Sequence, residues 1–193
     1  CQLVANLSAC ALETAILFEK TQTAREYFAE MAIRDGLTKL YNHQYFHNCL
    51  EKEFSRSSRY HAPLSLVFFD IDNFKRINDV YGHSHGDSVL SEIGELTRSV
   101  ARLSDVPARY GGEEFAIILP STPSEGAMEV ATRLGRIIRQ HRFKSLDGEQ
   151  ITISAGISTF QDNGVQSCDQ LLQRADKAMY QAKAQGKDRV VQV

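Results

Sequence analysis

Glycines and carboxylates stand together in one short stretch, Arg109-Tyr110-Gly111-Gly112-Glu113-Glu114-Phe115. Paired glycines favour a hairpin turn, because a tight hairpin needs positive φ angles that glycine adopts without a Cβ clash. They also let a bulky ligand approach the backbone, and the adjoining carboxylates can hold a divalent metal ion. For this stretch alone, a solvent-exposed hairpin without a functional role is the alternative.

A second acidic position lies upstream. Asp70 directly follows the apolar run Leu64–Phe69, which is typical of a buried strand. If that strand neighbours the hairpin, Asp70 and Glu113 converge, and their oxygens suit Mg²⁺ or Mn²⁺ better than zinc. Asp72 is an alternative acid, since strand alternation turns it toward the same side as Asp70. A single aspartate at a strand end is more often a turn former.

Several sequence blocks resemble the GGDEF family of diguanylate cyclases, here in a Gly-Gly-Glu-Glu-Phe form. The resemblance covers about residues 34–193, with the blocks in order and at similar spacing. Besides the glycine stretch, the blocks are Asp35-Gly-Leu-Thr-Lys-Leu-Tyr-Asn42, Asp70-Ile-Asp-Asn-Phe-Lys75, Asn78-Asp79, Gly82-His83, Gly86-Asp87, Ala175-Asp-Lys-Ala-Met-Tyr180 and Ala182-Lys-Ala-Gln-Gly-Lys187.

The resemblance implies condensation of two GTP molecules into cyclic di-GMP, with release of two pyrophosphates. The implied roles are metal ligation by Asp70, the Ile71 carbonyl and Glu113; catalysis by Glu113, Glu114 and Lys75; guanine binding by Asn78 and Asp87; phosphate binding by Lys183 and Lys187; and further substrate contacts by Phe74, Gly111 and Gly112. Lys187 replaces the family's usual arginine, so a point charge replaces a planar fork there. Taken singly, Asn78 and Asp87 also suit helix caps, and the lysines suit a solvated surface.

A control element is implied by Arg102-Leu-Ser-Asp105, which is separated from Gly111 by the five residues 106–110. This matches the spacing of the family's RxxD site for inhibitory cyclic di-GMP. Arginine can bind phosphate or the guanine O6/N7 edge, while aspartate accepts from N1 and N2. Arg133 on the next helix is a candidate second arm. A surface salt bridge is the alternative.

The surrounding pattern predicts an α+β fold. We expect helices over 43–59, around Asn78 and Asp79, over 88–102, over 124–141 and from a Ser167/Gln170 capping box to about Gln185. A loop is expected over 82–87. Strands are expected over 64–69, 106–110, 116–119, 151–160 and 190–193. The resemblance implies a mixed, mostly antiparallel sheet flanked by helices, the ferredoxin-like, polymerase-palm-like fold of nucleotide cyclases.

Residues 1–33 lack Pro and Gly and predict one long N-terminal helix. Its seven-residue repeat of Leu3, Cys10, Leu17, Ala24 and Met31 favours a dimerising coiled coil carried in from an upstream sensor domain, and its first half resembles the last helix of a GAF-type sensor. A helix packed on its own domain is the alternative. Because the chain starts at Cys1 in mid-pattern, we expect it to be part of a longer protein. The predicted domains are therefore 1–33 and 34–193.

Composition limits the partners. A net charge of −2 gives no general attraction to nucleic acid. The four scattered cysteines indicate reduced thiols of a cytoplasmic protein, and the family resemblance implies a bacterial one. No apolar run is long enough to span a membrane, so no direct membrane contact is expected, although the full-length protein could be tethered.

Two other functions compete with an active, homodimeric cyclase. One is a catalytically inactive receptor that binds cyclic di-GMP through Arg102 and Asp105. The other is a different nucleotide cyclase or a polymerase-like palm. The retained Asp70, Lys75, Glu113 and Glu114 argue against the receptor, and the Gly-Gly-Glu-Glu-Phe context argues against the other palm enzymes.

Overall fold

A computed structural model describes residues 17–21, 31–160 and 164–193. Backbone contacts divide the chain into two compact units, residues 1–34 and 35–193. In the first unit, residues 17–21 and 31–33 are helical. Most of the predicted heptad positions lie outside the described residues, so the dimerising helix stays a prediction. Among the described helices, none has both the length and the apolar character to cross a membrane.

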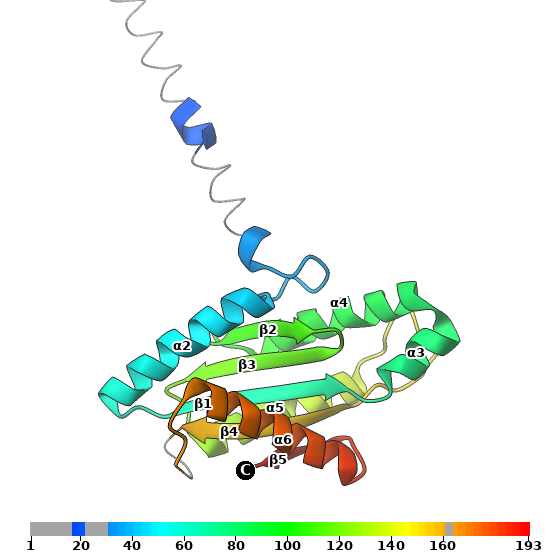
Figure 1. The fold of residues 1–193 in the computed structure, drawn as a ribbon. Helices are drawn as coiled ribbons and strands as arrows, with labels where there is room; N and C mark the ends of the chain where they lie inside the picture. The colour runs from blue at the N-terminus through cyan, green and yellow to red at the C-terminus, as the bar shows by residue number, and fades with distance from the viewer. Residues whose placement is uncertain (1–16, 22–30, 161–163) are drawn as a thin grey trace, which may run out of the picture. The chain divides into compact units, whose positions relative to one another are not determined.

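The second unit is built on a five-stranded sheet with the order β2-β3-β1-β4-β5 (Figure 1). Every neighbouring pair is antiparallel except β4 and β5, which run parallel, so the predicted mixed, mostly antiparallel sheet is confirmed. The strands are β1 (Leu64–Ile71), β2 (Val106–Gly111), β3 (Glu114–Pro120), β4 (Ile153–Phe160) and β5 (Arg189–Gln192).

Helices cover both faces of this sheet. One face carries α3 (Phe74–Tyr81), α4 (His83–Val100) and α5 (Ser124–Gln140), and the other carries α2 (His43–Tyr60) and α6 (Cys168–Ala184) (Figure 1). Two apolar cores result, one on each face. All eight residues of the central strand β1 are therefore buried, which explains its near-continuous apolar sequence.

Side-chain alternation along β1 assigns its residues to the two cores. Val67, Phe69 and Ile71 pack with α3, α4 and α5, whereas Leu66 and Phe68 pack with α2 and α6. Asp70 follows the parity of Phe68 and so points to the α6 face. The strand thus places a buried carboxylate on the α6 face at its last-but-one position.

The predicted loop over 82–87 is wrong, because α4 already begins at His83. Gly82, at φ 88°, turns the chain between α3 and α4 in a single residue, a conformation that glycine adopts without strain. The helix also ends at Val100 rather than at 102. Strand β4 begins at Ile153, two residues later than predicted.

The hairpin turn is displaced by one residue from the Gly-Gly pair. Gly111 pairs with Glu114, so the turn consists of Gly112 and Glu113, and of the two glycines only Gly112 has positive φ (33°). A register irregularity between Arg109 and Gly111 absorbs the difference. Glu113 therefore lies in the turn itself, where a side chain is free of the strand ladder.

Candidate active site

The two acidic segments meet at one edge of the sheet. Strand β1 pairs with β3, and Asp70 lies directly opposite Glu114. The Ile71 amide donates to the Glu113 carbonyl oxygen at 3.4 Å, so the hairpin turn closes over the end of β1. The predicted convergence of Asp70 with the glycine stretch is therefore present in the fold.

Burial and mutual repulsion set the protonation of these acids. Burial raises the pKa of Glu113 and of Glu114, and the negative charge of Asp70 raises both further. Burial likewise raises the pKa of Asp70, although Lys183 opposes that shift. Carboxylates gathered in this way favour a cation; Lys183 acts to lower the pKa of all three, and Lys187 also acts to lower that of Asp70.

That lysine holds only one oxygen of Asp70. Lys183 Nζ lies 2.8 Å from Asp70 Oδ2, while Asp70 Oδ1 is buried and has no hydrogen-bond partner. Such an oxygen is costly to leave unsatisfied. Within the described ranges, no three acidic, histidine or cysteine side chains converge as a finished metal site. The donor set nevertheless fits a hard cation, since it offers a free buried carboxylate oxygen beside two further carboxylates.

Asp72 has a structural role instead. Its Oδ1 accepts from Ser154 Oγ at 2.7 Å, and its Oδ2 accepts from Thr152 Oγ1 at 2.7 Å and from the Asp188 amide at 3.0 Å. Asp72 points to the same side as Asp70, as strand alternation predicts, but its oxygens are already occupied. The carboxylate ties β1, β4 and the entry to β5 together.

The candidate phosphate-binding residues surround the start of α3. Lys75 is exposed in the first turn of this helix, and the Lys187 ammonium donates to Asn73 Oδ1, just before the helix. Backbone N–H groups at a helix N-terminus favour anions, so lysines placed there suit a phosphate chain. The Phe74 ring is buried in the core, which leaves only its backbone to face a ligand. Among the candidate phosphate-binding lysines, Lys183 differs, because its ammonium pairs with Asp70.

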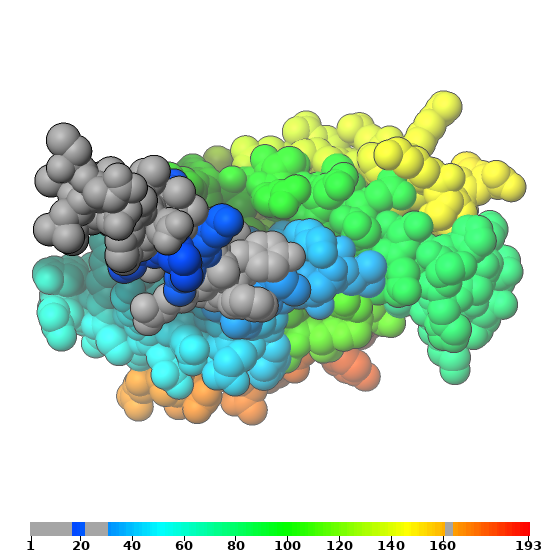
Figure 2. Space-filling model, turned by 90° about the horizontal axis from the view of Figure 1, so that it is seen from above, coloured from blue at the N-terminus to red at the C-terminus, as the bar shows by residue number. Residues whose placement is uncertain are grey.

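The candidate guanine-binding pair comes from two successive helices. Asn78 of α3 packs on Gly86 of α4 so closely that a Cβ there would lie 2.0 Å from Asn78 Oδ1. Asn78 therefore lies against the residue that precedes Asp87, which is itself exposed. The chain after α5 lies next to this corner (Figure 2), with Ser145 Oγ donating to the His85 carbonyl at 3.4 Å.

The RxxD residues share another corner, where α4 ends. Asp105 is buried and accepts from the Arg102 amide at 2.7 Å, which fixes the turn between them, while Arg102 itself is exposed. Arg133 of α5 donates to the Val100 carbonyl at 2.9 Å. The fold therefore brings Arg133 to within two residues of Arg102, although the two are far apart in sequence.

Sequence reasoning missed the role of Arg109. Its guanidinium donates to the Gly112 carbonyl at 2.8 Å and to Asp35 Oδ1 at 3.2 Å. Burial opposes the charge of Asp35, but hydrogen bonds from Thr38 and the Arg109 charge outweigh it and lower the pKa of Asp35. Arg109 thus fixes the turn and the first residues of the domain. In the sequence, the signal for this contact is limited to position: Asp35 and Arg109 each begin one of the motif blocks.

A pocket of about 480 Å³ opens beside Glu114 on the α6 side. Besides Glu114, the acids Asp169 and Asp176 line it, together with Phe68 and Tyr110. None of the candidate phosphate-binding lysines contributes to its lining. Three carboxylates repel a triphosphate, so the substrate chain fits the α3 side of the carboxylates better than this pocket.

Comparison with protein families agrees with this geometry. The model of the diguanylate cyclase GGDEF domain matches residues 32–189. This chain belongs to the GGDEF family. The response regulator PleD of Caulobacter vibrioides is 38% identical over 169 residues, which cover 86% of this chain and 37% of PleD. Diguanylate cyclase A of Treponema denticola is 37% identical over 194 residues, covering 97% of this chain and 48% of the relative. The chain thus spans less than half the length of either relative.

Solved GGDEF structures share the fold. The coiled coil and GGDEF domain of DgcB from Caulobacter crescentus, in complex with c-di-GMP, has a TM-score of 0.87 at 27% identity, covering 97% of this chain and 99% of that one. The active GGEEF domain of a diguanylate cyclase from Vibrio cholerae has a TM-score of 0.74 at 35% identity, covering 78% of this chain and 96% of that one. The second structure carries the same Gly-Gly-Glu-Glu-Phe form of the motif.

Proposed function

We propose that this GGDEF domain is an active diguanylate cyclase that condenses two GTP molecules into cyclic di-GMP with the help of Mg²⁺ or Mn²⁺. The observation that carries the proposal is the buried, unpartnered Asp70 Oδ1 beside the Gly112-Glu113 turn. A receptor that only binds product has no need of such an oxygen, whereas a cation-dependent phosphoryl transfer does.

Each residue then has a defined task. Asp70, the Ile71 carbonyl and Glu113 would hold the cation, which would neutralise phosphate charge and lower the pKa of the attacking 3′-hydroxyl. Glu113 accepts the proton of that hydroxyl, and Glu114 supports the site electrostatically. Gly111 and Gly112 let the nucleotide approach the backbone. Lys75 stabilises charge that develops on the phosphates, and Lys183 and Lys187 bind them.

Base selection rests on Asn78 and Asp87. Asp87 accepts from guanine N1 and N2, and the Asn78 amide serves the acceptor edge. An adenine base leaves these groups unpaired and is discriminated against for that reason. The direct test is incubation of the protein with GTP or ATP and Mg²⁺, followed by chromatography of the products. Formation of cyclic di-GMP from GTP, with no corresponding product from ATP, supports the proposal.

The same incubation distinguishes a cyclase from a receptor, because a receptor forms no cyclic di-GMP from GTP. Isothermal titration then shows whether the protein binds added cyclic di-GMP. Turnover and product binding are measured on the same preparation, so that a lack of product can be compared directly with retained binding.

A homodimer is part of the proposed mechanism. One site binds one GTP, so two domains must face each other to join two nucleotides. An upstream coiled coil, attached to a sensor domain, raises the effective concentration of one domain near the other. Bringing the two domains together is then a natural control point in a cytoplasmic signalling protein.

Addition of Mg²⁺ should stabilise the domain through Asp70. At a tenfold excess over its dissociation constant, a ligand adds about 1.4 kcal/mol, which for a domain of this size raises the melting temperature by about 3 °C. Burial raises the pKa of Glu113 and Glu114, and protons compete with the cation for these carboxylates, so the increase in melting temperature should grow as the pH rises from the ordinary glutamate range toward neutrality. Scanning calorimetry measures it. Asp70→Asn should lose most of this shift, whereas the exposed control Asp79→Asn keeps it.

Arg102→Ala should weaken product inhibition. The exposed Arg102 guanidinium is free to bind phosphate or guanine, and loss of one charge-assisted contact costs about 1.5–3 kcal/mol, or roughly ten- to hundredfold in the inhibitory concentration. The measurement is the initial rate against added cyclic di-GMP, normalised to each variant's uninhibited rate. Arg59→Ala, on α2, is the matched control. An unshifted inhibition curve for Arg102→Ala removes the RxxD assignment.

A further inference from the structure

The chain between α6 and β5 has an unusual backbone. Three consecutive residues have positive φ: Gly186 at 112°, Lys187 at 63° and Asp188 at 49°. Glycine tolerates this region, and aspartate enters it more readily than most residues, but lysine does so at a cost in free energy. Because Lys187 is a proposed phosphate-binding residue, contacts that hold this segment bear on the active site.

Backbone N–H groups of the segment are held from within the domain. The Lys187 amide donates to the Ala182 carbonyl at 3.0 Å, and the Asp188 amide donates to Asp72 Oδ2 at 3.0 Å. Asp72 directly follows Ile71, so the segment is fastened to the end of the strand that carries the proposed metal ligands. The Lys187 ammonium then reaches Asn73 in the turn that starts α3.

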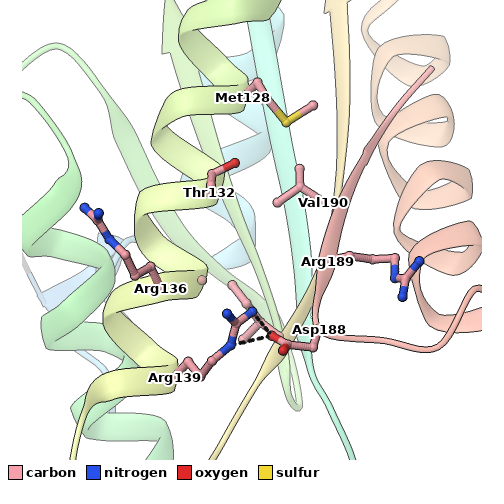
Figure 3. A pocket seen from close by; sticks show the side chains of 9 residues that line it. Met128, Thr132, Arg136, Arg139, Asp188, Arg189 and Val190 are labelled. Carbon is pink, nitrogen blue, oxygen red and sulfur yellow. Dashed lines mark hydrogen bonds and ion pairs between the residues drawn. The ribbon is translucent and has the colours of Figure 1, made fainter.

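An ion pair with α5 adds to these contacts. Arg139, in the last turn of α5, donates from Nε to Asp188 Oδ1 at 3.1 Å and from a second guanidinium nitrogen to the same oxygen. Figure 3 shows this pair at one end of a pocket of about 330 Å³ between α5 and β5. The labelled side chains of Arg136 and Arg189 point away from Asp188. Arg189 instead holds the backbone of the segment, since its Nε donates to the Lys187 carbonyl at 3.0 Å. Of these three arginines, Arg139 is the one whose guanidinium contacts the Asp188 carboxylate.

We infer that the Arg139–Asp188 pair is a positioning device for Lys187, holding the positive-φ segment so that the ammonium stays beside the N-terminus of α3. Neither residue touches the proposed substrate. This inference rests on the proposed function, because it assigns Lys187 to the GTP phosphates. It extends the proposed function to Asp188, in the connection between α6 and β5, and to Arg139 on α5.

A plain surface ion pair is the competing explanation. Both side chains are roughly 40% exposed (42% and 38%), and exposed pairs contribute little to stability. The two explanations differ in what they affect. A surface pair changes only the melting temperature, and slightly. A positioning pair changes GTP affinity, because release of the segment lets Lys187 leave its place.

The test compares Arg139→Ala with Arg136→Ala. Both arginines lie on α5 and line the same pocket, but only Arg139 contacts Asp188. We expect Arg139→Ala to raise the KM for GTP about fivefold, as for the loss of one phosphate contact of roughly 1 kcal/mol, with kcat changed less. Arg136→Ala should leave KM unchanged. Arg139→Lys, which keeps the charge, should lie in between.

A double-variant cycle isolates the pair. Asp188→Asn retains a residue that tolerates positive φ, so it removes the charge without forbidding the backbone. Its effect on KM should match that of Arg139→Ala, and the double variant should be no worse than either alone. Additive effects, or an unchanged KM with only a lower melting temperature, overturn the inference.

A binding readout keeps the two proposals distinct. Titration of a non-hydrolysable GTP analogue in the presence of Mg²⁺ should show the same fivefold loss for Arg139→Ala. If the wild-type protein binds the analogue but forms no cyclic di-GMP, the cyclase proposal fails while the positioning pair is still tested. If the wild type is active and Arg139→Ala binds and turns over GTP normally, only the positioning pair fails.

Discussion

Replacement of Glu113 by Gln is expected to lower cyclic di-GMP formation by about a thousandfold or more, since proton acceptance and charge stabilisation each contribute about two to three orders of magnitude. Glutamine retains the size of glutamate but carries no charge and cannot accept the hydroxyl proton. Glu113 is half-buried in the hairpin turn, where its side chain is outside the strand ladder. Product formation from GTP, followed by chromatography, measures the loss.

The fold should survive this substitution. Burial and the Asp70 charge raise the pKa of Glu113, so its charged form is disfavoured in the folded state. A neutral glutamine relieves that repulsion, and we expect the metal-free variant to melt no lower than the wild type. Glu95→Gln, the same change on the exposed face of α4, is the control and should retain full activity. Near-normal product formation by Glu113→Gln would exclude Glu113 as the proton acceptor.

The main features of the site could be predicted because they depend on strand adjacency and local chemistry. An apolar run that ends in Asp70 must be a buried strand, and a Gly-Gly pair flanked by strand residues must turn. The pairing of β1 with β3 then brings the acids together. The hairpin register is less certain from sequence, since a one-residue irregularity near Tyr110 moved Glu113 into the turn.

Long-range polar contacts could not be predicted in the same way. Asp72 serves Ser154, Thr152 and the Asp188 amide rather than a metal, and no local pattern distinguishes it from Asp70. The contact of Arg109 with Asp35 joins residues far apart in sequence. The start of α4 was missed for a different reason: Gly82 and Gly86 suggested a loop, but Gly86 is buried against Asn78 for close packing.

Gly156→Ala is expected to destabilise the domain by about 3 kcal/mol or more, because overpacking against backbone atoms that cannot rotate away is among the most damaging core changes. A Cβ on Gly156 of β4 would lie 2.0 Å from the Ala175 carbonyl oxygen and 2.2 Å from the Met179 amide nitrogen of α6. The helix must shift away from the sheet to admit it. Chemical denaturation followed by circular dichroism measures the change.

The consequence should extend to the site, because α6 also carries Lys183, the ion-pair partner of Asp70. Gly135→Ala is the matched control. Gly135 faces the same strand from α5, but its nearest neighbour to an added Cβ, a side-chain atom of Ile153, is 3.9 Å away. Alanine there should stabilise the helix by about 0.5–1 kcal/mol. Equal denaturation midpoints for Gly156→Ala and the wild type would mean that α6 does not pack this closely on β4, and the placement of Lys183 beside Asp70 would lose its structural basis.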